Sequence, residues 1–180
     1  MREIEVKILE INKEEIIKKL EFLNAQIILD DALIEDYNFD FQDNFLKKKK
    51  ELLRLRKIGK DVYLTHKKNY SIQNNIRKED EFETNIGNAE QMRIILQGLG
   101  FHITSIRQKR RTSYLLEKVR FEIDTYPEIP TYLEIEAPSE YKIKEMLEKL
   151  EIPLEKAVPL TGGEVIRKHG KNANHLLFNN

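Results

Sequence analysis

The chain has 180 residues, of which 40% are hydrophobic and 34% are charged, a composition typical of a folded domain. The 31 basic and 31 acidic side chains balance, so no overall charge favours nucleic acid or an anionic membrane, and an anion site would have to be local. Cysteine is absent, and neither a signal segment nor a long apolar run is found, so disulfides and thiolate metal ligands are excluded and a soluble cytoplasmic protein is expected.

Residues 2–8 form the first expected strand, because charged and apolar side chains alternate along them. Successive side chains of a strand point to opposite faces, so Glu3, Glu5 and Lys7 share one face. Two carboxylates about 7 Å apart, followed by an ammonium, could hold a hard cation beside an anion. The alternative is the solvent-exposed face of an ordinary half-buried strand.

The first helix is expected over residues 13–23, where Asn12 and Glu15 have the spacing of a capping box. Residues 44–50, which end in four lysines, are expected to form a solvated loop. Segments rich in β-branched and aromatic residues predict extended structure at 26–41, 52–57, 62–68 and 76–84.

A weak repeat relates the first strand and helix to a second pair. With a shift of 76 positions, two acidic strand residues and the helix cap recur, so that Glu3, Glu5 and Asn12 fall on Glu79, Glu81 and Asn88. A second helix is therefore expected between Asn88 and Gly100.

The last part of the chain returns to extended patterns and ends in two helices. One expected helix follows Ser139 and stops before Pro153. The remaining expected elements are strands at 106–115, 119–124 and 132–137 and a short helix at 164–169. These elements are assigned to a single domain, 1–170, followed by a C-terminal tail, 171–180.

Charged residues occupy every second position of the expected strands, which places them on one face. The other face is apolar in several strands, and helices with apolar stripes need such a surface to cover. The charged face is therefore expected on the wet inside of a curved or closed sheet, with an open sheet as the alternative. The residues of this face are Glu3, Glu5, Lys7, Arg54, Arg56, Lys67, Arg77, Glu79, Glu81, Arg107, Lys109, Arg111, Arg120, Glu122, Asp124, Glu134 and Glu136, together with the uncharged Thr65.

Three motifs stand out in this set, in the order Glu3-Ile4-Glu5-Val6-Lys7, Leu53-Arg54-Leu55-Arg56 and Leu133-Glu134-Ile135-Glu136. In combination they resemble the CYTH family, also called the triphosphate tunnel metalloenzymes. Within that family the chain is most similar to class IV adenylate cyclases and to thiamine triphosphatase-like members. The resemblance implies an α+β fold in which an eight-stranded antiparallel β-barrel forms a tunnel, with helices packed on the outside.

The same resemblance implies a triphosphate substrate and a divalent cation, Mg²⁺ or Mn²⁺, inside the tunnel. The implied metal ligands are Glu3, Glu5, Asp124, Glu134 and Glu136. The implied triphosphate-binding residues are Lys7, Arg54, Arg56, Lys67, Arg77, Lys109 and Arg111, of which Lys7, Lys67 and Arg111 are also assigned catalytic roles. Carboxylates together with phosphate oxygens suit Mg²⁺, and the guanidinium fork suits phosphate. The alternative is a set of cross-strand ion pairs that only stabilise the sheet, expected above all for Arg77 and Arg107 with glutamates.

Two segments depart from the family pattern. Ile129-Pro130-Thr131 replaces a glycine that often precedes the late motif, and Thr161-Gly162-Gly163 stands where many members carry a tyrosine. The C-terminal closure of the tunnel is therefore left open, with Lys168 and Lys171 as candidate phosphate ligands.

The implied function is that of a metal-dependent enzyme that converts ATP to cyclic AMP and pyrophosphate. Two alternatives stay open: a triphosphatase acting on tripolyphosphate, thiamine triphosphate or a nucleoside triphosphate, and a non-catalytic module that binds triphosphates or polyphosphate. A small-molecule triphosphate is the expected partner, without nucleic acid or membrane. The oligomeric state is not determined by the sequence, which is compatible with a homodimer.

Overall fold

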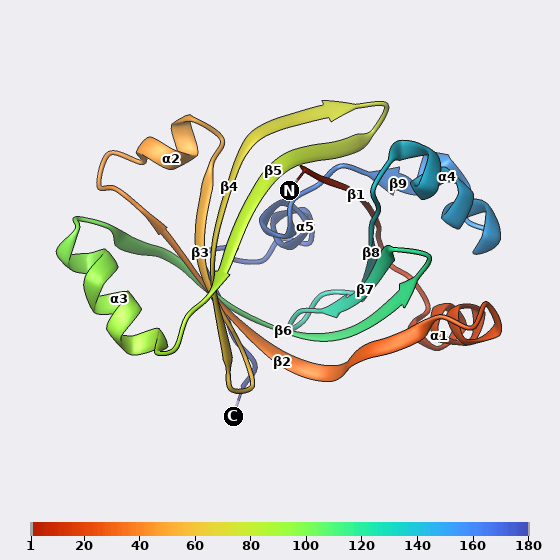
Figure 1. The fold of residues 1–180 in the computed structure, drawn as a ribbon, viewed down its shortest axis with the longest axis horizontal. Helices are drawn as coiled ribbons and strands as arrows, with labels where there is room; N and C mark the ends of the chain where they lie inside the picture. The colour runs from red at the N-terminus through yellow and green to blue at the C-terminus, as the bar shows by residue number, and fades with distance from the viewer. Residues whose placement is uncertain (1, 180) are drawn as a thin grey trace.

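The structure, a computed structural model that describes residues 2–179, is built on an antiparallel barrel of eight strands (Figure 1). The strands are β1 (Arg2–Ile8), β2 (Gln26–Asp40), β3 (Leu52–Ile58), β4 (Asp61–Gln73), β5 (Ile76–Asn85), β6 (His102–Leu116), β7 (Val119–Thr125) and β8 (Tyr132–Glu136). Their order around the barrel is β6-β2-β3-β4-β5-β1-β8-β7, and β7 pairs with β6 to close the ring. The expected α+β barrel is therefore confirmed.

Most of the helices pack outside the strand wall, and the last one lies across an end of the barrel. They are α1 (Lys13–Phe22), α2 (Phe45–Lys48), α3 (Ala89–Gly98), α4 (Glu140–Lys149) and α5 (Gly162–Lys168), with a 3₁₀ turn at Leu154–Lys156. Side-chain caps begin four of them, because Asn12, Asn88, Ser139 and Thr161 each accept a backbone N–H from the first turn. Within residues 2–179 no helix has both the length and the apolar character needed to cross a membrane.

The segment expected as a solvated loop contains the short helix α2, so the expected loop was wrong, although its four lysines, 47–50, are exposed as expected. The carboxylate of Asp40, at the end of β2, accepts hydrogen bonds from the backbone N–H groups of Leu46 and Lys47, each at 2.9 Å. These bonds satisfy donors that a helix start leaves free. The capping group lies five residues before Phe45, the first residue of the helix, outside the spacing that defines a cap in sequence.

The C-terminal segment is attached to the barrel. The two-residue strand β10 (His175–Leu176) pairs in parallel with β6, and Leu176 is buried. A second short strand, β9 (Ala157–Val158), pairs with β1. Between them α5 lies across one end of the barrel (Figure 1), where its first residues line the lumen.

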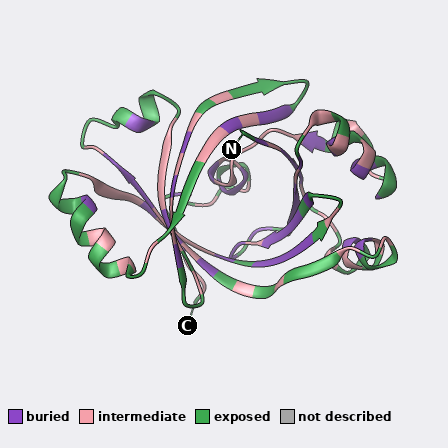
Figure 2. Ribbon diagram, in the orientation of Figure 1, coloured by how far each residue is buried: buried purple, intermediate pink, exposed green. Residues whose placement is uncertain are grey.

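The apolar core lies between the outer face of the barrel and the helices (Figure 2). Helices α1 and α4 cover β1, β7 and β8, and the fully buried side chains there include Val6, Leu20, Phe121, Ile135 and Met146. Burial of each such large side chain stabilises the fold by about 1.5–3 kcal/mol. Helix α3 covers a second cluster on β2 to β4. The charged faces of the strands are therefore left to the lumen, as expected.

The weak sequence repeat has a counterpart in the topology. β1 pairs with β5 and β2 pairs with β6, both antiparallel, so the halves β1–β4 and β5–β8 are related by an approximate two-fold arrangement. In this register Glu3 lies opposite Glu79. Acidic residues of both halves consequently meet in the lumen.

Candidate active site in the barrel lumen

The lumen is a cavity of about 1040 Å³ lined by side chains from all eight barrel strands, within the described chain, and by the start of α5. Of the metal ligands and triphosphate-binding residues that the family resemblance implied, all but one line it. Those residues are Glu3, Glu5, Lys7, Arg54, Arg56, Lys67, Arg77, Lys109, Arg111, Glu134 and Glu136. The exception is Asp124, which is fully buried behind the lining.

Three carboxylates form a compact group in the lumen. Glu3 and Glu5 project from β1 and Glu134 from β8, and one oxygen from each lies within 4.8 Å of the others. The group forms because β1 and β8 are neighbours whose register sets Lys7 opposite Glu134. Burial, partly offset by Lys67 and reinforced by Glu5, raises the pKa of Glu3 well above its ordinary value. Three carboxylate oxygens this close together are donors that fit a hard divalent cation.

Glu136 lies outside this group, although it comes from the same motif. It is opposite Glu5 in the β1–β8 register, and burial together with Glu122 raises its pKa to about 7. Its carboxyl group is therefore close to half protonated at neutral pH. Its assignment as a metal ligand stays a prediction.

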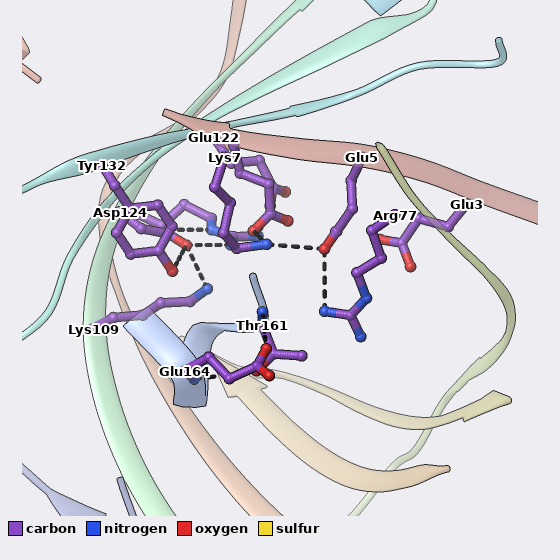
Figure 3. Close-up of polar contacts among 12 residues, drawn as sticks. Glu3, Glu5, Lys7, Arg77, Lys109, Glu122, Asp124, Tyr132, Thr161 and Glu164 are labelled. Atoms are coloured by element: carbon purple, nitrogen blue, oxygen red, sulfur yellow. Dashed lines mark hydrogen bonds and ion pairs between the residues drawn. The ribbon is translucent and has the colours of Figure 1, made fainter. Parts of the chain in front are cut away.

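Asp124 is surrounded by hydrogen-bond donors (Figure 3). Its oxygens accept from Lys109 Nζ at 2.7 Å, from Arg111 Nε and Nη2 at 2.6 Å each, and from the Tyr132 hydroxyl at 3.0 Å. Burial opposes its charge, but Arg111 and Lys109 outweigh that effect and lower the pKa of Asp124. These contacts are those of a carboxylate that orients two cations toward the lumen, and its assignment as a metal ligand stays a prediction.

The lumen lysines are paired with the carboxylates. Lys7 Nζ lies 2.7 Å from Glu134 and 2.9 Å from Glu5. Lys67 contacts Glu3 and lies 3.0 Å from Glu79. Burial alone would lower the pKa of both lysines, but these carboxylates raise it above the ordinary value. Both lysines therefore keep their positive charge at neutral pH.

Lys109 differs from them in its surroundings. Burial and the adjacent Arg111 lower the pKa of Lys109 to about 8, although Asp124 opposes the shift. Its ammonium would gain from an additional anion in the lumen, because the single carboxylate it contacts is shared with Arg111.

Arg77 and Arg107 were both expected to pair with glutamates, and only Arg77 does. Arg77 Nη2 lies 2.6 Å from Glu79 and Nη1 lies 3.3 Å from Glu5. Arg107 has no carboxylate partner within the described residues, so the expectation for it was wrong. Its Nε instead donates to the backbone carbonyl of Ala173 at 2.5 Å.

Arg56 is bound by Asp36, which also lines the lumen. The guanidinium donates to both carboxylate oxygens, from Nε at 2.7 Å and from Nη2 at 2.8 Å. The two residues are opposite each other in the β2–β3 register. Arg54, on the same strand, lies 3.9 Å from Glu83, and its Nη2 donates to the Thr65 hydroxyl at 3.4 Å. Its buried Nε has no acceptor among residues 2–179.

Comparison with known proteins accounts for this arrangement of charges. A family model described as the CYTH domain matches residues 1–161. The chain belongs to the CYTH family. Its charged lumen is thus the interior of a CYTH barrel.

Relatives of this CYTH chain extend over almost its whole length. A protein of Methanocaldococcus jannaschii that carries the provisional name adenylate cyclase is 27% identical over 169 residues, which are 93% of this chain and 95% of that protein. The structure of a Pyrococcus horikoshii protein is 28% identical with a TM-score of 0.73, covering 88% of this chain and 96% of that one. A Hippeastrum protein, named provisionally as an adenylyl cyclase and described as having a dominant triphosphatase activity, shares the fold at 17% identity and a TM-score of 0.68, with 94% and 97% covered.

The C-terminal closure of this CYTH barrel comes from α5 and uses glycine for close approach. A Cβ atom on Gly162 would lie 3.1 Å from the hydroxyl of Tyr126, which lines the same end of the lumen. Lys168 and Lys171 are not among the lining residues, and Lys171 pairs with Glu128, which argues against either as a phosphate ligand.

The sequence did not assign two lumen tyrosines, Tyr126 and Tyr132, to the site. Tyr132 shares its strand face with Glu134 and Glu136, so the period of two could have placed it there. Tyr126 follows β7 in a connection, where no period exists.

Asp36→Asn should lower the free energy of unfolding by about 3 kcal/mol at neutral pH, because it leaves the Arg56 charge without its partner. Burial opposes the ionised form of Asp36, but Arg56 outweighs burial and lowers its pKa far below the ordinary value. Since the folded pKa is the lower one, the stabilisation is present above the unfolded pKa of about 3.9 and is lost as the pH falls below it.

The predicted pH-dependent stabilisation by Asp36 is checked by urea unfolding of the wild type and Asp36→Asn between about pH 3 and pH 7. The difference in unfolding free energy should stay constant above about pH 5 and shrink below about pH 4. The exposed Asp61→Asn variant is the control and should match the wild type throughout. A constant difference down to pH 3 would show that Asp36 is not the titrating group.

Proposed function

We propose that this CYTH protein is an enzyme that acts on triphosphates with a divalent cation, and that it converts ATP to cyclic AMP and pyrophosphate. The observation that supports the proposal is the juxtaposition in one lumen of a three-carboxylate group with lysines and arginines from five other strands. Lysines and arginines alone would bind an anion, whereas carboxylates alone would bind a metal ion. Both together suit a metal-bound polyphosphate.

Glu3, Glu5 and Glu134 would hold the cation, which when bound would neutralise negative charge on the phosphates. Lys7 and Arg77 lie against these carboxylates and can turn their donors to phosphate oxygens entering the lumen. Arg111 is held in a fixed orientation by Asp124, which accepts from Nε and Nη2, and by Glu122, which contacts Nη1, so its guanidinium is oriented before substrate arrives. The protein thus supplies preorganised side chains that bind the phosphates, and it does not supply the nucleophile.

The cyclase reaction needs the ribose 3′-oxygen to attack the α-phosphorus in line with the departing pyrophosphate. A lumen of about 1040 Å³ is at the upper end of ligand pockets and has room for a nucleoside beside three phosphates. The name of the Methanocaldococcus jannaschii relative supports this branch. Hydrolysis of a terminal phosphate is the second candidate, supported by the triphosphatase activity of the Hippeastrum protein.

ATP and tripolyphosphate, each incubated with enzyme and Mg²⁺ or Mn²⁺, distinguish these branches. We expect cyclic AMP and pyrophosphate in equal amounts from ATP, and no product when EDTA removes the metal. Phosphate from tripolyphosphate without cyclic AMP from ATP would identify a triphosphatase. Binding of both compounds without turnover would identify a non-catalytic module.

A further inference from the structure

Arg107 is a lumen cation that pairs with no carboxylate among residues 2–179. Strand β6 directs Arg107, Lys109 and Arg111 into the cavity at every second position. Lys109 and Arg111 share the carboxylate of Asp124. The residue opposite Arg107 on β2 is Asp36, but both of its oxygens are taken by Arg56.

The acid nearest in sequence to the start of α5 is also engaged. The carboxylate of Glu164 accepts the backbone N–H of Thr161 at 2.7 Å in a capping box (Figure 3). Arg107 therefore adds uncompensated positive charge at the α5 end of the lumen. Its Nη1 and Nη2 have no acceptor within residues 2–179, and the half-buried residue lines the cavity.

The C-terminal segment holds this guanidinium in place. Its Nε donates to the Ala173 carbonyl, and a Cβ atom on Gly163 would lie 3.2 Å from both Nη1 and Nη2. Glycine at position 163 therefore leaves the space that the guanidinium fills. Two separate points of the chain, on α5 and just before β10, thus fix a side chain whose remaining donors are free.

We propose that Arg107 is a further substrate-binding residue, which donates to a phosphate oxygen at the α5 end of the lumen and is positioned there by Gly163 and Ala173. This inference rests on the proposed triphosphate function. A free guanidinium edge, held in a fixed orientation and facing a cavity lined by other cations, is suited to bidentate contact with a phosphate. The competing role is a structural tie that only anchors the C-terminal segment.

Arg107→Gln and Arg107→Lys test the proposal, with Arg110→Gln as the matched control. Arg110 is on the same strand but on the outer face, where it pairs with the exposed Asp31. The probe is bis-methylene triphosphonate, a tripolyphosphate analogue without a cleavable P–O–P bridge. Its binding to each protein variant is measured by calorimetric titration in the presence of Mg²⁺. We expect Arg107→Gln to weaken binding about tenfold or more, Arg107→Lys to weaken it less, and Arg110→Gln to leave it unchanged.

Gly163→Ala provides a second test that does not depend on removing a charge. Its Cβ would displace the Arg107 guanidinium, while alanine in a helix does not lower the melting temperature by itself. We expect binding about threefold weaker or more, with an unchanged or higher Tm. The control is Gly98→Ala, a helical glycine of α3 with nothing within 4 Å of its Cβ position, which should not alter binding.

The outcomes separate the two proposals. If the wild type binds the analogue and the Arg107 and Gly163 variants bind it equally well, the role of Arg107 is overturned and the proposed function stands. A lower Tm of Arg107→Gln with unchanged affinity would likewise assign Arg107 to a structural tie. If the wild type itself does not bind, the proposed function fails and this inference fails with it.

Discussion

Glu5→Gln is expected to reduce metal-dependent turnover by about a hundredfold or more while the protein stays folded. Glu5 contributes one of the three clustered carboxylate oxygens, and an amide removes the negative charge that a divalent cation needs. The fold should tolerate the change, because each cation that contacts Glu5 keeps another carboxylate. Lys7 retains Glu134, and Arg77 retains Glu79.

Turnover of ATP and of tripolyphosphate at saturating Mg²⁺ and Mn²⁺, with Tm measured alongside, checks this expectation. Glu35→Gln is the matched control, since Glu35 is a glutamate on the outer face of β2 that pairs with Lys57. It should keep wild-type activity. Full activity of Glu5→Gln at saturating metal would show that Glu5 is not a metal ligand. The same measurement on Glu136→Gln would show whether Glu136 belongs to the metal site.

Asp124→Asn should have the largest effect on stability, lowering the free energy of unfolding by about 3–5 kcal/mol. Asp124 is fully buried and is the carboxylate that Lys109 and Arg111 share. The amide would leave buried Lys109 without a carboxylate partner among the described residues, and buried Arg111 with Glu122 alone. For a chain of this size the loss corresponds to a fall in Tm of about 10 °C.

The metal dependence of this variant decides what Asp124 does. If Asp124 orients cations, the Mn²⁺ concentration that gives half-maximal activation should stay near the wild-type value, while KM for the triphosphate rises. The exposed Asp61→Asn variant is the control for both measurements. Wild-type stability combined with a large loss of metal affinity would falsify the orienting role and identify Asp124 as a metal ligand.

The sequence by itself determined which face each functional residue occupies. Side chains in a strand alternate with a period of two whatever the surrounding fold, so Glu3, Glu5 and Lys7 had to share a face opposite Ile4 and Val6. Local spacing also determined most helix starts, because a cap bonds to backbone within its own first turn. These features need no knowledge of which strands are neighbours, and together with the family motifs they predicted the barrel and its charged lumen.

The tertiary structure alone decided which of the charged residues meet. Glu134 joins Glu3 and Glu5 because β8 pairs with β1, whereas Glu136, two positions away, does not join them. Barrel closure and strand register bring cations of β6 onto Asp124 of β7 and leave Arg107 facing α5 without an acid. Register and neighbour choice depend on contacts between segments far apart in the chain, and a period of two within one strand carries no information about them.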